Sequence, residues 1–157
     1  MKKCILLLTS FLLFSNLNAT ITCSFTAVND MNFGNYDVFD PIDKDVKRNL
    51  KIKCTSNSIY NEFKVINVNL SSGSSGYYSN RTMYDGSNIL NYNLYRNNAR
   101  SILWYDRTNG TKNYRKKIKV KKNRGFKKRL KIFGRIPALQ DASNGYYTDS
   151  IVVEIIY

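Results

Sequence analysis

The chain of 157 residues contains three cysteines and no histidine, which limits the chemistry it can perform. The usual activated nucleophiles of hydrolases are serine or cysteine paired with a histidine base, so such pairs are excluded. A zinc site built from the cysteines has too few ligands without histidine. The glycine-rich residues 71–76 lack the lysine and the following helical pattern that a phosphate-binding loop requires. We therefore expect no catalytic residue, no metal ligand, no cofactor-binding residue and no cofactor.

Four aspartates close together in the sequence are the remaining arrangement that could support catalysis. Asp37, Asp40, Asp43 and Asp45 lie around Pro41. Two carboxyl groups at a suitable separation cleave glycosidic bonds, and this cluster contains enough aspartates to supply such a pair, so a secreted hydrolase is one alternative. Acidic residues beside a proline turn are far more often solvated loop residues. We therefore interpret the chain as non-enzymatic and keep a hydrolase as the least favoured alternative.

The first 19 residues have the three-part composition of a secretory signal peptide. A short positive start is followed by an apolar run over residues 5–14 and by a polar, small-residue segment that can be cleaved after Ala19. The apolar run is too short to span a bilayer, and a buried N-terminal helix is the alternative. We expect export through the Sec pathway to the periplasm, and then to the cell surface or the extracellular space. Residues 20–157 would form one domain with no transmembrane segment.

Two cysteines, Cys23 and Cys54, remain after removal of the predicted leader. In an exported chain a pair of thiols is expected to form a disulfide, and two free thiols are the alternative. Closing the loop between them would stabilise the fold by about 3–4 kcal/mol, because it restricts the unfolded chain.

Apolar and polar residues alternate with a period of two in several segments, which predicts β-strands with one face on a core. Within residues 61–70 the alternation slips by one position, which suggests a β-bulge. No helical stripe of about twelve residues is present, and Gly and Asn clusters separate the strands. Short strands with frequent turns predict an all-β sandwich. The clearest alternating sets are Leu50, Ile52 and Cys54, then Leu90, Tyr92 and Leu94, and finally Ile151, Val153, Ile155 and Tyr157.

Residues 112–131 form the most basic segment, with 12 lysine or arginine residues in 20 positions. Apolar residues alternate with the cations on both sides of a turn at residues 123–125, which predicts a β-hairpin whose cations face solvent. Lysine on an exposed strand also prevents edge-to-edge aggregation, and that role alone could explain the segment. The cations assigned to this basic hairpin are Lys116, Lys117, Lys119, Lys121, Lys122, Arg124, Lys127 and Lys128.

The basic segment carries the whole net charge of the predicted exported domain. The sequence has 25 basic and 11 acidic side chains, so loss of Lys2 and Lys3 with the leader leaves 23 against 11, a net charge of +12. Nucleic-acid binding also needs stacking aromatics or a reading element, and the segment contains only Tyr114 and Phe126 as aromatics. We expect no specific nucleic acid as a partner. A self-contained secreted module that binds anionic polysaccharide or DNA through the hairpin is the second functional hypothesis.

Several short motifs occur along residues 20–157 in an order that resembles a known protein family. In chain order the motifs are Cys23, residues 32–37, Cys54, residues 71–83, 90–95 and 99–100, Trp104, residues 133–138 and 145–149, and a final strand that ends at Tyr157. Together they resemble the spore coat protein U (SCPU) domain family, which includes subunits of archaic chaperone–usher pili of the Csu type. No single motif is diagnostic, but the shared order makes the resemblance specific.

The resemblance implies an immunoglobulin-like β-sandwich that is incomplete because its last strand is missing. In such subunits a periplasmic chaperone lends a strand and a neighbouring subunit later fills the same groove, which is strand addition to an open sheet edge. Without a partner, an apolar edge of this kind aggregates. The family's disulfide would carry over to Cys23 and Cys54. Because the chain stops at the end of an alternating strand, the strand bordering the acceptor groove would carry Ile151, Val153, Ile155 and Tyr157.

The resemblance therefore implies a structural subunit of a chaperone–usher pilus or of a coat-like surface assembly. Its partners would be a periplasmic chaperone, an usher and other pilus or coat subunits, with anionic surfaces as a further class. Polymerising Csu-type subunits carry an alternating apolar extension before their first cysteine, whereas cleavage after Ala19 would leave only residues 20–22 before Cys23 here. We expect the chain to accept a strand and not to donate one from its N-terminus. The lysine-rich segment also departs from the family pattern.

Overall fold

The computed structural model describes residues 20–108 and 112–157, so the predicted leader lies outside the described residues. The described residues form eight β-strands and no α-helix. None of their segments is a helix long and apolar enough to cross a membrane. In chain order the strands are β1 (Ile21–Val28), β2 (Lys44–Ser56), β3 (Glu62–Leu70), β4 (Arg81–Asp85), β5 (Asn88–Tyr95), β6 (Tyr114–Val120), β7 (Phe126–Ile136) and β8 (Val153–Ile156).

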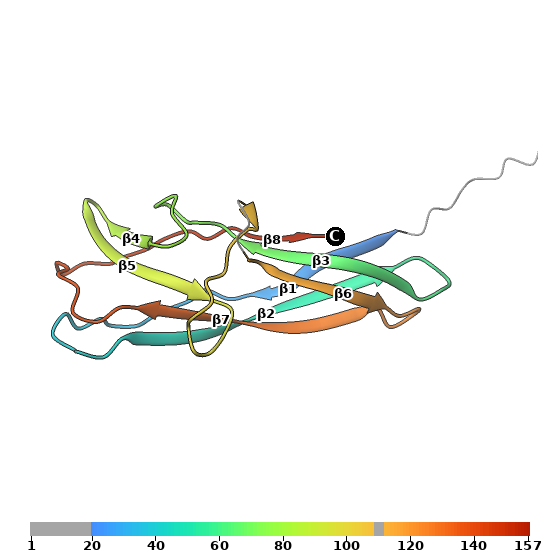
Figure 1. Cartoon of the computed structure of the whole chain (residues 1–157), viewed down its shortest axis with the longest axis horizontal. Helices are drawn as coiled ribbons and strands as arrows, with labels where there is room; N and C mark the ends of the chain where they lie inside the picture. The colour runs from blue at the N-terminus through green and yellow to red at the C-terminus, as the bar shows by residue number, and fades with distance from the viewer. Residues whose placement is uncertain (1–19, 109–111) are drawn as a thin grey trace, which may run out of the picture.

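The strands form two antiparallel sheets that make the two layers of a sandwich (Figure 1). The larger sheet has five strands in the order β1-β2-β7-β5-β4, and the smaller has three in the order β6-β3-β8. The chain changes sheet several times along its length, as it does in immunoglobulin-like sandwiches. The predicted all-β, immunoglobulin-like architecture is confirmed.

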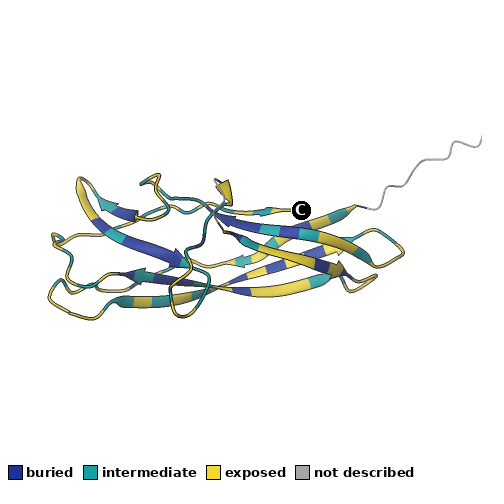
Figure 2. Cartoon of the chain, viewed as in Figure 1, coloured by how far each residue is buried: buried dark blue, intermediate teal, exposed yellow. Residues whose placement is uncertain are grey.

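An apolar core fills the space between the two sheets (Figure 2). On β2, Leu50, Ile52 and Cys54 are at most 1 % exposed, while the lysines between them face solvent. On β3, every second residue from Ile66 to Leu70 is fully buried. The two-residue alternation therefore identified the buried faces of these strands, because burial of one face is what the pattern encodes.

Trp104, in the segment between β5 and β6, connects the two layers. Its side chain is buried in the core. The indole Nε1 donates a 2.9 Å hydrogen bond to the carbonyl of Val68 on β3. The backbone N–H of the same residue donates a 2.9 Å bond to the carbonyl of Leu94 on β5. The ring thus supplies a large buried surface while its polar end is satisfied, which is the stable arrangement for a buried indole.

The slipped alternation in β3 does not produce a bulge, and that prediction is wrong. β3 pairs with β6 without a break in register. Phe63 instead lies on the solvent face, where its ring centre is 5.6 Å from the Nζ atoms of both Lys117 and Lys119. The two ammonium groups lie within cation–π distance of this exposed ring, so the apolar residue on the outer face of the strand has favourable contacts there. The irregular pairing falls in β1, between Phe25 and Ala27.

The basic segment turns as predicted, and a single antiparallel bridge joins Lys121 to Gly125, but β6 and β7 do not pair with each other, so the predicted β-hairpin is wrong. β6 pairs with β3 in the smaller sheet, whereas β7 pairs with β2 and β5 in the larger sheet. The chain crosses between the sheets through residues 121–125, where Asn123 and Gly125 have φ values of 60° and 64°. Alternation identifies the buried face of a strand but not its neighbour. Ile118 and Leu130 reach the same core equally well from opposite sheets.

The eight cations assigned to the hairpin are all exposed but are divided between three parts of the fold. They lie on β6 (Lys116, Lys117 and Lys119), in the crossing segment (Lys121, Lys122 and Arg124) and on β7 (Lys127 and Lys128).

Candidate functional site

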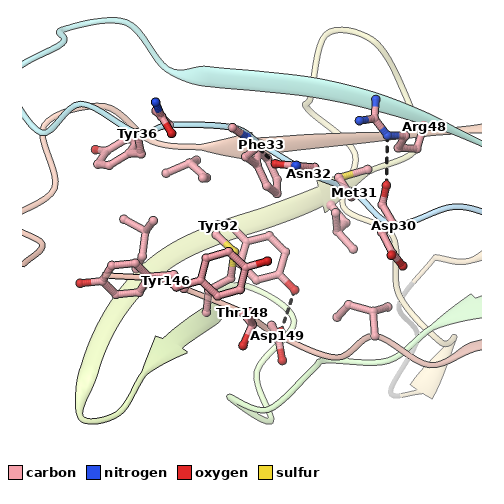
Figure 3. Close-up of a pocket in the computed structure, with 18 of the residues that line it drawn as sticks. Asp30, Met31, Asn32, Phe33, Tyr36, Arg48, Tyr92, Tyr146, Thr148 and Asp149 are labelled. Carbon is pink, nitrogen blue, oxygen red and sulfur yellow. Dashed lines mark hydrogen bonds between the residues drawn. The ribbon is translucent and has the colours of Figure 1, made fainter. Parts of the chain in front are cut away.

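A groove of about 910 Å³ enters the sandwich between residues 28–36, at and after the end of β1, and residues 142–149, before β8 (Figure 3). Its floor comes from both sheets and is apolar. Every floor residue named here is at most 9 % exposed, so the groove reaches down to the core. The floor residues are Leu70 from β3, Met83 from β4, Leu90 and Leu94 from β5, and Ile136 from β7.

The first wall of the groove follows β1 and rests directly on the larger sheet. Phe33 packs edge-on against Tyr92 of β5, with ring centroids 6.0 Å apart and ring planes at 70°. Gly134 of β7 lies beneath this wall, and a Cβ atom at that position would overlap Met31 Sδ and Phe33 Cζ. The missing side chain on β7 therefore allows the wall to approach the sheet. Figure 3 shows Met31, Phe33 and Tyr36 along this side, facing Tyr146 and Thr148.

The second wall is fastened to β4 and β5. The backbone of Thr148 exchanges two hydrogen bonds with Tyr84 of β4, of 2.8 and 3.0 Å. The carboxylate of Asp149 accepts hydrogen bonds from the Tyr92 hydroxyl (2.7 Å), the Ser74 backbone N–H (2.8 Å) and the Ser74 hydroxyl (2.7 Å). Burial, reinforced by the bond to Asp149, raises the pKa of Tyr92 above its ordinary value. The phenol therefore stays a hydrogen-bond donor over the whole neutral range.

Tyr36 fixes the far end of the first wall to the segment after β7. Its hydroxyl donates to the Pro137 carbonyl (2.8 Å) and accepts from the Gln140 backbone N–H (2.9 Å). The Gln140 side chain in turn bonds to both the N–H and the carbonyl of Asn91 on β5, at 2.8 and 2.9 Å. This end of the groove is therefore a hydrogen-bonded frame.

β8 borders the other end of the groove and is an outer strand of the smaller sheet. Ile151 and Val153 line the groove, and Ile155 packs on the core from the same side of the chain. Tyr157 follows the strand and is 41 % exposed. Among the described strands β8 pairs with β3 alone, and β1, whose Val28 lines the groove, pairs with β2 alone. The groove thus lies between two sheet edges that each have one neighbour.

The sequence profile of the Spore Coat Protein U domain matches residues 9–154. The chain belongs to this family. Among 15 matching chains of solved structures is one from the CsuC–CsuE chaperone–tip adhesion subunit pre-assembly complex of the archaic chaperone–usher Csu pili of Acinetobacter baumannii. The TM-score is 0.57 and the sequence identity is 16 %, so the likeness shows a shared fold. The match covers 88 % of this chain and only 40 % of that chain. A comparison with curated protein sequences finds no match.

This SCPU domain contains the predicted disulfide between Cys23 and Cys54. The two residues are directly paired partners on β1 and β2, with Cα atoms 4.0 Å apart. Cys54 is fully buried in the core. The bond therefore ties the outer strand β1, which leads into the first wall of the groove, to its neighbour β2 within the larger sheet.

A positioning residue that sequence reasoning missed is Arg81, on β4 of the SCPU domain. It is fully buried. Its guanidinium donates to the carbonyl of Ser71 (3.0 and 2.8 Å), to the carbonyl of Trp104 (2.7 Å) and to Oδ1 of Asn93 (2.8 Å). Burial lowers the pKa of Arg81 from its usual value. The residue fixes the start of the glycine-rich loop whose Ser74 holds the second wall.

Two of the clustered aspartates, Asp37 and Asp40, cap turns in the segment before β2. Each Oδ1 accepts a 2.9 Å hydrogen bond from the backbone N–H two residues further on. This is the solvated turn role expected for acidic residues beside a proline. No group of three histidine, cysteine, aspartate or glutamate residues suited to a metal ion occurs in residues 20–108 and 112–157.

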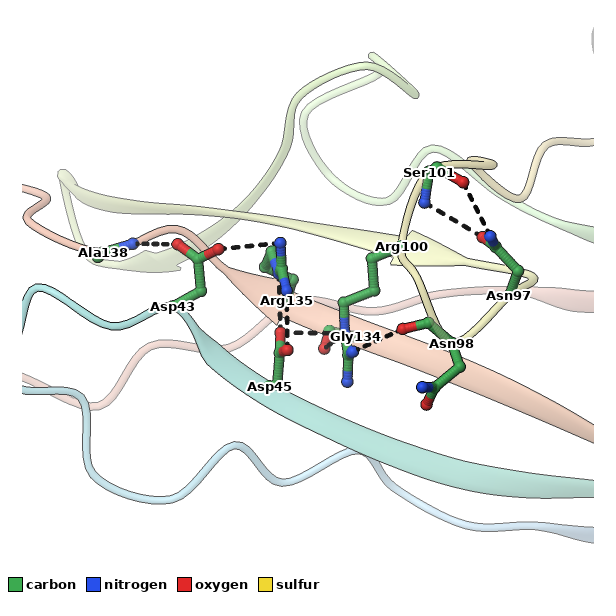
Figure 4. A network of polar contacts seen from close by, with 9 residues as sticks. All are labelled: Asp43, Asp45, Asn97, Asn98, Arg100, Ser101, Gly134, Arg135 and Ala138. Carbon is green, nitrogen blue, oxygen red and sulfur yellow. Dashed lines mark hydrogen bonds and ion pairs between the residues drawn. The ribbon is translucent and has the colours of Figure 1, made fainter.

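The other two clustered aspartates form an ion-pair network on the outer face of the larger sheet (Figure 4). Asp43 pairs with Arg135 at 2.9 Å, and Asp45 pairs with Arg135 at 2.8 Å and with Arg100 at 3.0 Å. The hydrogen bond from Arg135 and the charges of both guanidinium groups hold the pKa of Asp45 below its usual value. These carboxylates are therefore engaged with arginines and are not arranged as an acid–base pair.

Proposed function

We propose that this SCPU chain is a non-enzymatic subunit of a chaperone–usher pilus or of a coat-like surface assembly, and that a β-strand from another chain completes its sandwich. The observation that carries the proposal is the apolar-floored groove of about 910 Å³ between residues 28–36 and 142–149, which ends at the outer strands β1 and β8. A strand laid beside β8 would gain main-chain hydrogen bonds from it and insert every second side chain between the sheets. Ile151, Val153, Ile155 and Tyr157 would border that strand.

Membership of the SCPU family and the fold likeness to a chain of the Csu chaperone–subunit complex support this assignment. In this proposal a periplasmic chaperone donates the first strand and a neighbouring subunit later replaces it, while an usher is a further partner of the assembly. The route is export through the Sec pathway, the periplasm and then the cell surface. Covering the groove also removes the aggregation hazard of an open apolar edge.

The start of the described chain supports an acceptor role. Ile21 and Thr22 are already paired with Ser56 and Thr55 of β2, so they are part of the larger sheet. Residues bonded in this way cannot at the same time lie in the groove of a neighbour. Donation from this part of the chain would require β1 to detach against the disulfide at Cys23.

A designed donor strand tests the proposal. The full chain is expressed in the periplasm alone, with its chaperone, or with a strand of alternating Val and Thr joined after Tyr157 by a short turn. We expect the chain alone to be insoluble or degraded. Either form of completion should give soluble protein with one cooperative urea transition. The matched control carries the same extension with proline at two alternate positions, which removes main-chain donors and should restore insolubility.

Hydrogen exchange gives a second readout that does not depend on yield. Backbone amides of β8 should exchange slowly in the completed protein and rapidly when the extension carries the prolines. A soluble, stable monomer of the unextended chain whose β8 amides are already protected would contradict strand completion. That result would mean that the groove is a surface feature and does not receive a strand from another chain.

A further inference from the structure

The outer face of the larger sheet carries a row of cations that the sequence pattern did not single out. Alternate residues of β2 and β7 point away from the core, and the outward positions in the middle of both strands are mostly lysine or arginine. Only one of them, Lys127, belongs to the cations assigned to the predicted hairpin. We define the β2–β7 basic face as the exposed side chains of Lys47, Lys51, Lys53, Lys127, Arg129 and Lys131.

The register of the two strands places like charges directly opposite each other. Lys51 pairs with Arg129, and Lys53 pairs with Lys127. Like charges in directly opposed positions of a sheet are destabilising. All three ion pairs of the described residues lie around Asp45, at the other end of these strands, so none includes a cation of the β2–β7 basic face. The repulsion is therefore not relieved by acidic side chains of the described chain.

The shape of this face favours one kind of anion. Cations on one strand repeat about every 7 Å, and the neighbouring row lies about 5 Å away. None of the large exposed hydrophobic side chains belongs to β2 or β7, so the face offers no ring on which a base could stack. It also presents no helix or projecting ribbon that could enter a groove of duplex DNA. A double row of flexible, positively charged side chains fits a chain with regularly spaced carboxylate or sulfate groups.

We propose that the β2–β7 basic face binds a linear anionic polysaccharide. The ligand would lie along the strands and bring negative charge between the opposed pairs, which relieves their repulsion. Binding of this kind is electrostatic and weakens as ionic strength rises.

The face and the groove lie on opposite sides of the larger sheet. Ile132 and Ile136 of β7 line the groove, whereas Arg129 and Lys131 point to the other side. Strand completion therefore leaves the basic face open, and polysaccharide binding does not rest on the proposed pilus role. The two proposals can fail separately.

Charge-matched variants test the site. The full chain, in its soluble form with or without chaperone, is titrated with heparin and with polygalacturonate at several salt concentrations. We expect the double variant Lys51→Gln, Arg129→Gln to bind at least tenfold more weakly. The control Lys117→Gln, Lys119→Gln removes the same charge from the smaller sheet and should change affinity less than twofold. Equal losses in the two variants would mean that net charge alone is responsible and would overturn the proposal.

The melting temperature provides a second test, because it should differ between two variants that have the same net charge. Without ligand, Lys51→Gln, Arg129→Gln should melt at a higher temperature than the parent chain because the opposed charges are gone. Heparin should raise the melting temperature of the parent and of the Lys117→Gln, Lys119→Gln control, but hardly that of the face variant. Tighter binding to duplex DNA or to phosphatidylglycerol vesicles than to heparin at equal ionic strength would overturn the choice of polysaccharide.

Discussion

The hydroxyl of Tyr92 donates a 2.7 Å hydrogen bond to Oδ2 of Asp149, and this contact joins β5 of the larger sheet to the wall that leads into β8. The ring of Tyr92 also supports Phe33 of the opposite wall. One buried side chain therefore positions both sides of the groove. Its partner Asp149 is held from the other direction by Ser74.

Removing the Tyr92 hydroxyl should weaken the attachment of the second wall, while the aromatic ring stays in the core and leaves no cavity. We expect Tyr92→Phe to lower the free energy of unfolding by about 1–2 kcal/mol, because one partner of a buried, charge-assisted hydrogen bond is lost. The measurement is urea unfolding of the strand-completed protein. The control Tyr146→Phe deletes the hydroxyl of a side chain that is 84 % exposed and should change stability by less than about 0.5 kcal/mol. Equal effects would argue against a special role for Tyr92.

The same buried phenol predicts a loss of stability at alkaline pH. Burial, with the hydrogen bond to Asp149, raises the pKa of Tyr92 above its ordinary value of 10, and burial likewise raises that of Tyr78 to about 12. An acid whose folded pKa is raised contributes stability that is complete below pH 10 and is lost as pH rises above it. Unfolding midpoints between pH 9 and about 11.5 should therefore fall, and less steeply in Tyr92→Phe. A parallel decline in both proteins would contradict the assignment.

Gly134 should tolerate no side chain. A Cβ atom there would overlap Met31 Sδ and Phe33 Cζ, so Gly134→Ala must displace the first wall. We expect a loss of about 1–3 kcal/mol in the strand-completed protein. Adding Met31→Ala makes room for the new methyl group, so the double variant should lose less than the sum of the two single losses. Additive losses measured by urea unfolding would show that the two side chains do not compete for space.

The ion-pair network should make the fold sensitive to acid. The hydrogen bond from Arg135, with the charges of Arg100 and Arg135, lowers the pKa of Asp45 below its ordinary value of 3.8. A lowered folded pKa contributes stability that is present above about pH 4 and is lost as pH falls through the folded value. Since Asp45 is partly exposed, we expect Asp45→Asn to remove only about 0.5–1 kcal/mol at pH 7. The difference between variant and parent should vanish near pH 2, and a constant difference would contradict this origin.

Loss of the disulfide should destabilise the fold and free the edge strand β1. We expect the double variant Cys23→Ser, Cys54→Ser to lose about 3 kcal/mol, and reduction of the parent chain with dithiothreitol to have a similar effect. Hydrogen exchange should show the largest gain in exchange rate in β1, which has a neighbour on one side only. Uniform acceleration across both sheets would instead point to a general effect on the unfolded chain.

The isolation of Arg81 from other charged residues is a signal in the sequence that the pattern of alternating residues does not use. It is the single charged residue within positions 65–84. An isolated charge in a strand is ordinarily expected at the surface. Here it is fully buried because three backbone or side-chain oxygens, from Ser71, Trp104 and Asn93, converge on it. Those oxygens come from separate segments, so only the folded chain brings them together.

The basic segment shows the limit of alternation more directly. The pattern correctly predicts that Ile118 and Leu130 are buried and that the cations between them are exposed. It does not state that β6 and β7 belong to different sheets. A two-residue period is a local property, whereas the choice of neighbour depends on contacts between residues that are distant in the sequence.

By itself, the amino-acid sequence determined the β class, the buried face of most strands, the pairing of Cys23 with Cys54 and the family resemblance. Each of these follows from composition, from spacing along the chain or from the order of motifs. The tertiary structure alone decided which strands lie side by side, and hence the groove between residues 28–36 and 142–149 and the opposition of Lys51 to Arg129. The reason is physical. Burial is encoded locally by alternating side chains, but strand register and sheet edges emerge only when distant segments share one core.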